Sequence, residues 1–373
     1  HLPELAFLIL GTYFTAPFCG SKKEKTERTL FTGNTNSARM NNILILPRKR
    51  RRNEKMKAVK NGKIVIIGAG HVGSHCGLSL MMQGLATEIV YIDIDKNKAA
   101  MQALDLDDMA SNLDRDFTVR AGDYCDCADA HIVVMAAGKS RLPGQTRLDM
   151  FDDSIKMMNT IVGPLKESGF HGILISISNP ADIIADFLRK RLGLPRNQVF
   201  STGTSLDSAR LRRMLSEITG VSRHSIQAYC MGEHGDSQFI PVSHIQIGGI
   251  PVKEYLSIHP EYRDKMDFDK ISAEDKVCGF HIVEGKGCTE FGIGAVLSNI
   301  ARAVMHDEKR ILPVSVLLEG EYGEQGIPAG VPCVIGKNGV EEILEISLTE
   351  KEKEQLHNSC NVIRGFVEKA DQM

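Results

Sequence analysis

Three glycines in the segment Gly68-Ala-Gly-His-Val-Gly73 constrain the fold of this chain more than any other feature. They follow the mostly apolar run 63–67, whose composition is typical of a buried parallel strand. At this spacing Gly68 permits a tight turn, Gly70 lets the backbone approach a pyrophosphate, and Gly73 lets the next helix pack close to the sheet. Amide groups at the start of that helix would hold phosphate oxygens. The segment therefore predicts a dinucleotide-binding turn.

An acidic residue at the end of the next predicted strand indicates which dinucleotide binds. The run 88–93 is typical of a second strand, and it ends in Asp93, twenty residues after Gly73. A carboxylate there can accept hydrogen bonds from both ribose hydroxyls and would repel a 2′-phosphate. We therefore predict NAD rather than NADP. The alternative, that Asp93 caps the following helix, stays open at this point.

Strand-like runs alternate with amphipathic stretches from Lys63 onward, which is the pattern of a doubly wound parallel sheet. The predicted strands are 63–67, 88–93, 118–121, 131–136, 172–176 and 198–201, and the predicted helices between them are 72–82, 96–110, 150–167 and 181–191. The fold class expected is α/β, with a Rossmann-type NAD-binding domain over 59–203.

The pattern changes after about residue 202, and a mixed α+β catalytic domain is expected over 204–373. Its predicted elements are a long helix at 205–219, strands at 224–230 and 237–247, two more helices, a strand pair around 313–321 and 332–346, and a last helix at 350–369. Apolar residues at helical spacing in the last helix indicate a core-facing side.

The N-terminal stretch differs in composition from the rest of the chain. Residues 1–55 hold eleven of the 45 Lys and Arg but four of the 47 Asp and Glu, which leaves the remainder with 34 basic and 43 acidic residues. We expect 1–58 to be a disordered or non-native extension, because Met56 resembles a natural start. The acidic remainder argues against nucleic acid as a partner. The apolar opening is too short to span a membrane. Nine scattered cysteines favour a reducing cytoplasm.

A second informative segment, Gly232-Glu-His-Gly-Asp236, places a histidine between glycines in a predicted turn. Histidine suits proton exchange near neutral pH, although a histidine in a turn is more often structural. Asp207 and Arg210 open the helix at 205–219, and their spacing of three residues puts them on one face. The loop 138–147 contains Pro143-Gly144 and is typical of a closing lid.

From about residue 60 to its end, the chain resembles the L-lactate/L-malate dehydrogenase family, in order and without large gaps. It is most similar to the bacterial L-lactate dehydrogenases, and 165–172 also resembles the L-2-hydroxyisocaproate dehydrogenases. The resemblance rests on Asp93 and on GAGHVG (68–73), AAGKSRLPGQTRLD (136–149), SISNPADI (176–183), STGTSLDSARLR (201–212), GEHGDS (232–237) and EGKGCTEFGIG (284–294).

The resemblance implies an NAD-dependent oxidoreductase acting on the CH–OH group of 2-hydroxy acids. It implies that His234 exchanges a proton with the substrate oxygen, that Asp207 orients and stabilises its imidazolium, and that Arg210 clamps the substrate carboxylate. Arg147 would polarise the carbonyl, and Asn179 would position the nicotinamide side of the site. These roles agree with the chemistry, because hydride transfer to a 2-keto acid needs an anchor, a proton donor and charge stabilisation in a closed site.

The substrate side of the site gives two indications that disagree. Arg141, six residues before Arg147, stands at the family's specificity position, where an arginine implies a second substrate carboxylate and hence malate. Thr289 and the segments 203–210 and 319–323 resemble the lactate enzymes instead. We expect L-lactate dehydrogenase (pyruvate and NADH to L-lactate and NAD). L-malate and L-2-hydroxyisocaproate dehydrogenase stay open as alternatives.

Two functions of other classes are alternatives to a dehydrogenase. One is a non-catalytic NAD-binding sensor, since a fold does not determine a function. The other is an NAD-dependent glycosidase with a metal held by Cys230 and His234; we expect no metal. The resemblance further implies a homo-oligomer, either a tetramer or a dimer, working in fermentative metabolism in the cytoplasm.

Overall fold

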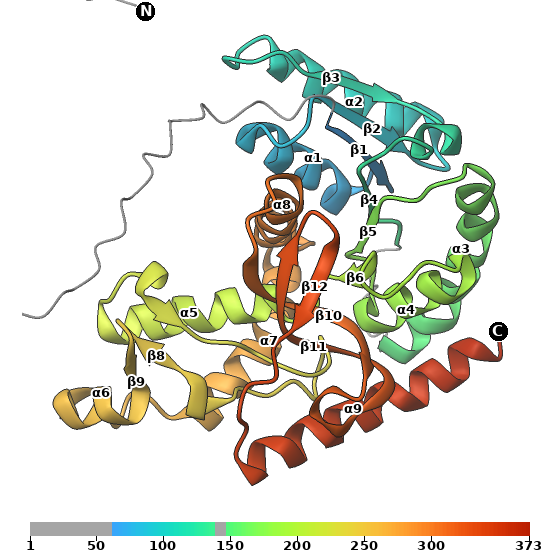
Figure 1. Cartoon of the computed structure of the whole chain (residues 1–373). Helices are drawn as coiled ribbons and strands as arrows, with labels where there is room; N and C mark the ends of the chain where they lie inside the picture. The colour runs from blue at the N-terminus through green and yellow to red at the C-terminus, as the bar shows by residue number, and fades with distance from the viewer. Residues whose placement is uncertain (1–61, 139–146) are drawn as a thin grey trace, which may run out of the picture. The chain divides into compact units, whose positions relative to one another are not determined.

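The computed structural model describes residues 62–138 and 147–373, with side chains from 151 onward in the second range (Figure 1). A nine-stranded sheet in the order β12-β11-β10-β6-β5-β4-β1-β2-β3 forms its centre. A second sheet has three short strands in the order β7-β8-β9.

Six strands of the large sheet run parallel and confirm the predicted doubly wound fold. They are β1 (Lys63–Ile67), β2 (Glu88–Ile92), β3 (Thr118–Ala121), β4 (Ile132–Met135), β5 (Ile173–Ser176) and β6 (Val199–Ser201). The central strand β1 pairs with β2 on one side and with β4 on the other. The strand order reverses there, and ligands of such sheets bind outside the carboxyl ends of the strands at this switch point.

Helices cover both faces of this sheet. The first four are α1 (His71–Gln83), α2 (Lys96–Ala110), α3 (Arg147–Glu167) and α4 (Ala181–Leu192). Among the later helices, α8 (Phe291–Met305) packs against α1, and α9 (Glu350–Asp371) packs against α4. Because helices lie on both faces, the parallel strands are buried on both sides, which explains why their sequences are almost wholly apolar.

The strands expected as a closing pair in the second domain instead extend the first sheet. Strand β10 (Arg310–Glu319) pairs antiparallel with β6, where Ser315 faces Ser201. Strands β11 (Gln325–Gly336) and β12 (Gly339–Ile343) continue the sheet outward. The addition of β10 protects what would otherwise be an exposed edge of β6.

The predicted strands at 224–230 and 237–247 are mostly wrong. The structure forms only the short strands β7 (Ile226–Gln227), β8 (Gln246–Ile247) and β9 (Ile250–Pro251). Pro241 has no amide hydrogen to donate to a sheet, and a turn of 3₁₀ helix over Val242–His244 follows it. This small sheet packs with α5 (Ser205–Thr219) and α6 (Val252–Ile258) around a separate apolar cluster.

Three helices, rather than the two expected, lie between the small sheet and β10. They are α6, α7 (Phe268–Lys286) and α8. The predicted helices at 205–219 and 350–369 are confirmed as α5 and α9. A capping box between Thr349 and Glu352 begins α9.

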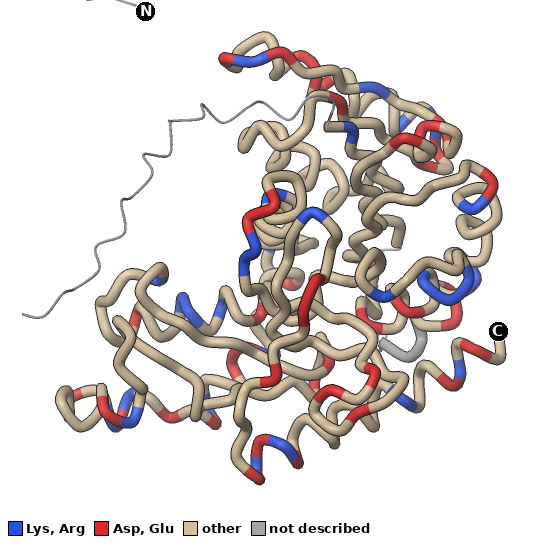
Figure 2. The backbone as a smooth tube through the Cα atoms, in the orientation of Figure 1, with Lys and Arg blue, Asp and Glu red and all other residues tan. Residues whose placement is uncertain are grey.

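Charged residues of both signs are interspersed over the described backbone (Figure 2). Within that part of the chain, no helix combines the length and the apolar composition needed to cross a bilayer.

Candidate active site

The glycine turn has the geometry that close approach to a dinucleotide requires. Gly68 has φ +106°, and a Cβ there would lie 2.6 Å from the backbone carbonyl carbon of Ala136. A Cβ at Gly73 would lie 1.9 Å from the carbonyl oxygen of Gly68. At Gly70, the residue before α1, a Cβ would meet nothing within 4 Å, so this face of the turn is open. The turn therefore fits a pyrophosphate held on the amides that begin α1.

Asp93 is held at the carboxyl end of β2 by the backbone. One carboxylate oxygen accepts from Ala69 N at 2.7 Å and the other from Asp95 N at 2.9 Å. The cap of α2 is Asp95, which accepts from Lys98 N at 3.0 Å, so the alternative role considered for Asp93 is excluded. Each Asp93 oxygen keeps a second lone pair, and the carboxylate can still accept from ribose hydroxyls.

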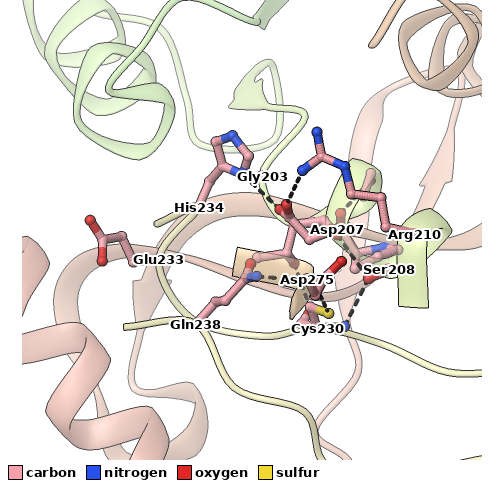
Figure 3. A network of polar contacts seen from close by, with 12 residues as sticks. Gly203, Asp207, Ser208, Arg210, Cys230, Glu233, His234, Gln238 and Asp275 are labelled. Atoms are coloured by element: carbon pink, nitrogen blue, oxygen red, sulfur yellow. Dashed lines mark hydrogen bonds and ion pairs between the residues drawn. The ribbon is translucent and has the colours of Figure 1, made fainter. Parts of the chain in front are cut away.

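His234, Asp207 and Arg210 form one polar cluster (Figure 3). Asp207 Oδ2 lies 2.6 Å from His234 Nδ1, and Asp207 Oδ1 accepts from Arg210 Nη1 at 3.0 Å. The side chains are 4%, 22% and 11% exposed for Asp207, His234 and Arg210, respectively. The Asp207 carboxylate is thus shielded from water, while His234 keeps a surface that a substrate can reach.

Helix α5 carries Asp207 in its first turn and is tied to the segment that leads to His234. Thr204 Oγ1 donates to Cys230 O at 2.6 Å, and Cys230 N donates to Ser208 Oγ at 2.8 Å. These two bonds connect the start of α5 to the chain four residues before His234. The separation of acid and imidazole is therefore set by the backbone.

Backbone pairing and a hydrogen bond from α9 hold the turn that carries His234. Met231 and Phe239 pair as an antiparallel bridge, and Gly232, with φ +90°, pairs with Gly330 of β11. Ser359 Oγ of α9 accepts from Glu233 N at 2.8 Å. A Cβ at Gly232 would lie 2.4 Å from that hydroxyl oxygen, so the turn needs glycine both for its φ and for space.

Asp182 also supports the His234 turn, and the sequence analysis did not single it out. Its Oδ2 accepts from His234 N at 2.9 Å, and the residue is 1% exposed. Burial raises the pKa of Asp182 to about 6, against the opposing effect of the His234 amide. The only available signal was its place after Asn179 in the segment 176–183.

The electrostatics of the cluster keep Asp207 ionised. Burial alone raises the pKa of Asp207, but His234 and Arg210 outweigh that effect and hold the pKa below its ordinary value. A carboxylate in this state accepts from His234 Nδ1 and leaves Nε2 to exchange a proton with a ligand.

Asp275 of α7 is a second buried carboxyl that the sequence analysis missed. Its Oδ2 accepts from Gln238 Nε2 at 3.0 Å and from Cys230 Sγ at 3.5 Å, while Oδ1 has no hydrogen-bond partner among the described residues. Burial, and then the nearby charge of Asp207, raise the pKa of Asp275 to about 7. Among the residues that the structure describes, no cationic side chain forms an ion pair with Asp275.

We expect Asp275→Asn to stabilise the protein above neutral pH. Between pH 4 and 7 the folded protein keeps a proton on Asp275 that the unfolded chain has released, so this group lowers stability as pH rises. Asn removes the ionisation but keeps the shape. The gain in free energy of unfolding should be about 4 kcal/mol at pH 8 and close to zero at pH 4. Urea unfolding at both pH values measures it.

The matched control for that experiment is Asp264→Asn at an exposed position, which should leave the pH dependence of stability unchanged. Parallel stability curves for the starting protein and Asp275→Asn would contradict the assignment of a raised pKa.

The structure describes some of the other predicted site residues. Asn179 follows β5 and lines a pocket of about 40 Å³ that His234 also lines. Thr289 is half-buried between α7 and α8. Arg147 is the first residue of α3, but its side chain and the whole of Arg141 lie outside the described residues.

A dinucleotide turn on a doubly wound sheet, together with a carboxylate-bound histidine and a shielded arginine, defines a nicotinamide-dependent dehydrogenase. Two family models agree with this class. Residues 62–201 match lactate/malate dehydrogenase, NAD binding domain, and residues 204–373 match lactate/malate dehydrogenase, alpha/beta C-terminal domain. The chain belongs to the lactate/malate dehydrogenase family. The predicted family, enzyme class and NAD cofactor are thereby confirmed.

Curated relatives and solved structures support the same family. The chain is 41% identical over 306 residues to an L-lactate dehydrogenase of Fusobacterium nucleatum, covering 82% of this chain and 96% of the relative. It is 43% identical over 305 residues to L-lactate dehydrogenase 3 of Bacillus thuringiensis, with the same coverage. A ligand-bound minor L-lactate dehydrogenase from Enterococcus mundtii superposes with a TM-score of 0.80 at 36% identity, covering 83% of this chain and 98% of that one.

Proposed function

We propose that this protein interconverts pyruvate and L-lactate with NADH and NAD as the hydride carriers. The observation that carries the proposal is the position of Asp207 between His234 and Arg210, which provides a proton donor beside a carboxylate anchor. The relatives named above are L-lactate dehydrogenases. A structural neighbour, the lactate dehydrogenase of Cryptosporidium parvum, was solved with lactic acid and NAD at a TM-score of 0.79 and 27% identity over 84% of this chain and 99% of that one.

The bound coenzyme supplies the hydride, and side chains of this protein manage the proton and the charge. His234, protonated and hydrogen-bonded through Nδ1 to Asp207, gives its Nε2 proton to the keto oxygen as the carbon is reduced. Asp207 stabilises the imidazolium beforehand and keeps the ring oriented afterwards. Arg210 binds the substrate carboxylate with the guanidinium nitrogens that do not face Asp207. In the oxidation of lactate, neutral His234 accepts the hydroxyl proton.

The other predicted site residues bind the coenzyme or the substrate. In this proposal Gly68, Gly70, Gly73 and Asp93 hold the coenzyme, and Asn179 positions its nicotinamide end. Arg147 polarises the substrate carbonyl. Most of the loop predicted to close over the site lies outside the described residues. Thr289, in the segment between α7 and α8, contacts the substrate.

The proposal also covers the organisation of the chain. Residues 59–203 form the NAD-binding domain and 204–373 the catalytic domain, while the predicted extension 1–58 lies outside the described residues. The protein works in the cytoplasm as a homotetramer or homodimer, because the resemblance to lactate and malate dehydrogenases implies sites beside subunit interfaces.

The principal alternative is L-malate dehydrogenase, which Arg141 favours. If Arg141 faced the substrate, a pyruvate methyl would leave its charge unpaired, while oxaloacetate would supply a second carboxylate. The lactate function therefore requires that the charge of Arg141, which lies outside the described residues, is not left unpaired against the pyruvate methyl. A dehydrogenase for bulkier acids, such as 2-hydroxyisocaproate, is the third candidate.

The experiment that tests the function compares kcat/KM for pyruvate, oxaloacetate and 2-ketoisocaproate in the starting protein and in Arg141→Gln. Under the lactate proposal we expect pyruvate to be the best substrate, and we expect the substitution to change kcat/KM for pyruvate by less than about tenfold, because pyruvate has no second carboxylate to pair with the guanidinium. Lys139→Gln is the matched control for a lost charge in the same loop. A preference for oxaloacetate that Arg141→Gln lowers several-hundredfold would establish the malate function instead.

The same assay separates the other classes of function. An NAD-binding sensor would bind NADH without oxidising it in the presence of any 2-keto acid. A metal-dependent glycosidase would lose activity in a chelator. The two side chains considered as its ligands are engaged by different carboxyls, because the buried Cys230 thiol donates to Asp275 Oδ2 and His234 Nδ1 is bound to Asp207.

A further inference from the structure

Glu290, between α7 and α8, is a nearly buried carboxylate surrounded by metal-ligating side chains. It is 8% exposed. Its Oε2 lies 3.5 Å from His71 Nδ1, 3.2 Å from His75 Nδ1 and 3.4 Å from Cys288 Sγ. Its Oε1 is bound by Lys286 Nζ at 2.5 Å, which leaves Oε2 directed at the other three groups.

The side chains come from two parts of the chain that the fold brings together. His71 and His75 lie in the first turns of α1, directly after the open face of Gly70. Cys288 and Glu290 flank Thr289 in the segment that joins α7 to α8. Helices α1 and α8 approach closely, since a Cβ at Gly294 would lie 2.8 Å from His75 O. The group therefore lies between the coenzyme turn and a predicted substrate residue.

The spacing of three ligand atoms suits one tetrahedral ion. Zn²⁺ bonds of about 2.0–2.1 Å to N or O and about 2.3 Å to S place neighbouring ligands about 3.4–3.6 Å apart. The measured N···O and S···O separations to Glu290 are 3.5 and 3.4 Å. The ligand atoms of His71, Cys288 and Glu290 all lie within 4.8 Å of one another. For all three atoms to bind one ion, the separation between the His71 ring nitrogen and Cys288 Sγ must be about 3.6 Å.

The donor set also selects the metal. One imidazole nitrogen, one thiolate and one carboxylate form a mixed set that suits Zn²⁺ and related transition metals, whereas Mg²⁺ and Ca²⁺ prefer oxygen ligands alone. His75 Nδ1 already contacts His71 O at 2.8 Å, so only three protein ligands are counted, and the fourth position of a tetrahedral ion would be left to water. Binding releases the thiol proton of Cys288 to solvent.

We propose that His71, Cys288 and Glu290 form a three-ligand Zn²⁺ site that links the coenzyme turn to the segment between α7 and α8. The site holds the start of α1 against Thr289 and is separate from the His234 cluster. It departs from the expectation of no metal, which rested on local sequence spacing, because His71 and Cys288 are far apart in the chain. The inference is independent of which 2-hydroxy acid is the substrate.

The test is a titration of the chelator-treated full chain with Co²⁺, followed by displacement with Zn²⁺. We expect a thiolate-to-cobalt absorption band with one ion per chain, and a Zn²⁺ Kd in the micromolar range or tighter. Cys288→Ser should abolish the band, and His71→Ala should weaken Zn²⁺ binding by about a hundredfold. Cys278→Ser, a partly exposed thiol on α7, is the matched control and should leave both measurements unchanged.

Circular dichroism and thermal unfolding in chelator establish that each variant is folded, so a lost band reports a lost ligand. Two results would overturn the proposal. One is the absence of Zn²⁺ binding tighter than millimolar in the starting chain. The other is a thiolate band that persists in Cys288→Ser.

Discussion

Asp207→Asn is expected to lower kcat for pyruvate reduction by about a thousandfold. The carboxylate accepts from His234 Nδ1 at 2.6 Å, and this bond fixes the tautomer that leaves Nε2 free to carry the transferred proton. An Asn amide can present its NH₂ group to the ring instead, which favours the opposite tautomer and removes the negative charge that stabilises the imidazolium. Steady-state oxidation of NADH, measured across pH, tests this expectation.

Two features of the result would distinguish a chemical role for Asp207 from a structural one. The affinity for NADH should be unchanged, because Asp207 lies outside the glycine turn. The rate of pyruvate reduction by the variant should begin to fall at a lower pH than in the starting protein, because the imidazolium is no longer stabilised by a neighbouring charge. Asp264→Asn provides the exposed control. A kcat within tenfold of the starting value would refute the role proposed for the pair.

The parallel strands could be predicted from the sequence with nearly correct bounds because their burial on both faces leaves a local signature. Runs such as Ile64–Ile67 are almost wholly apolar and at most 2% exposed, and glycine or polar residues bound them. The glycine turn is equally local, since its three residues act within one strand–turn–helix unit.

The errors in the fold lie where pairing depends on distant residues. Nothing near β10 in the sequence indicates that Ser315 meets Ser201 of β6, because the contact is made only after the parallel sheet has formed. The prediction of a strand at 237–247 is wrong. Its apolar residues alternate as in a strand, but Pro241 has no amide hydrogen to donate to a neighbouring strand.

The site residues that stand in contiguous motifs could be predicted from the sequence. The site residues whose role depends on burial could not. His234, Asp207 and Arg210 stand in recognisable segments, and the structure places His234 and Arg210 each within hydrogen-bonding distance of Asp207. Asp182 and Asp275 affect the same cluster, but only as buried carboxyls whose partners come from other elements. Their identity as Asp carries no local indication of that burial.

Arg210→Lys is the second substitution from which we expect a large effect, a fall in kcat/KM for pyruvate of about a thousandfold. The Arg210 guanidinium is held by Asp207 on one side, and a Cβ at Gly279 of α7 would lie 3.1 Å from its Nη2. This close packing fixes the plane of the guanidinium, so its remaining N–H groups can bind a carboxylate in the two-pronged geometry that an ammonium group cannot provide. Separate measurement of kcat and KM tests this role.

Whether the loss appears in kcat or in KM shows which role Arg210 has. An anchor for the substrate carboxylate should raise KM for pyruvate strongly and leave the affinity for NADH unchanged, whereas a residue that only supports Asp207 should lower kcat at an unchanged KM. Arg213→Lys is the matched control, because that arginine lies on the same helix and pairs with Glu217 at the surface. If Arg210→Lys kept the starting KM for pyruvate, the carboxylate of the substrate would have to be bound elsewhere.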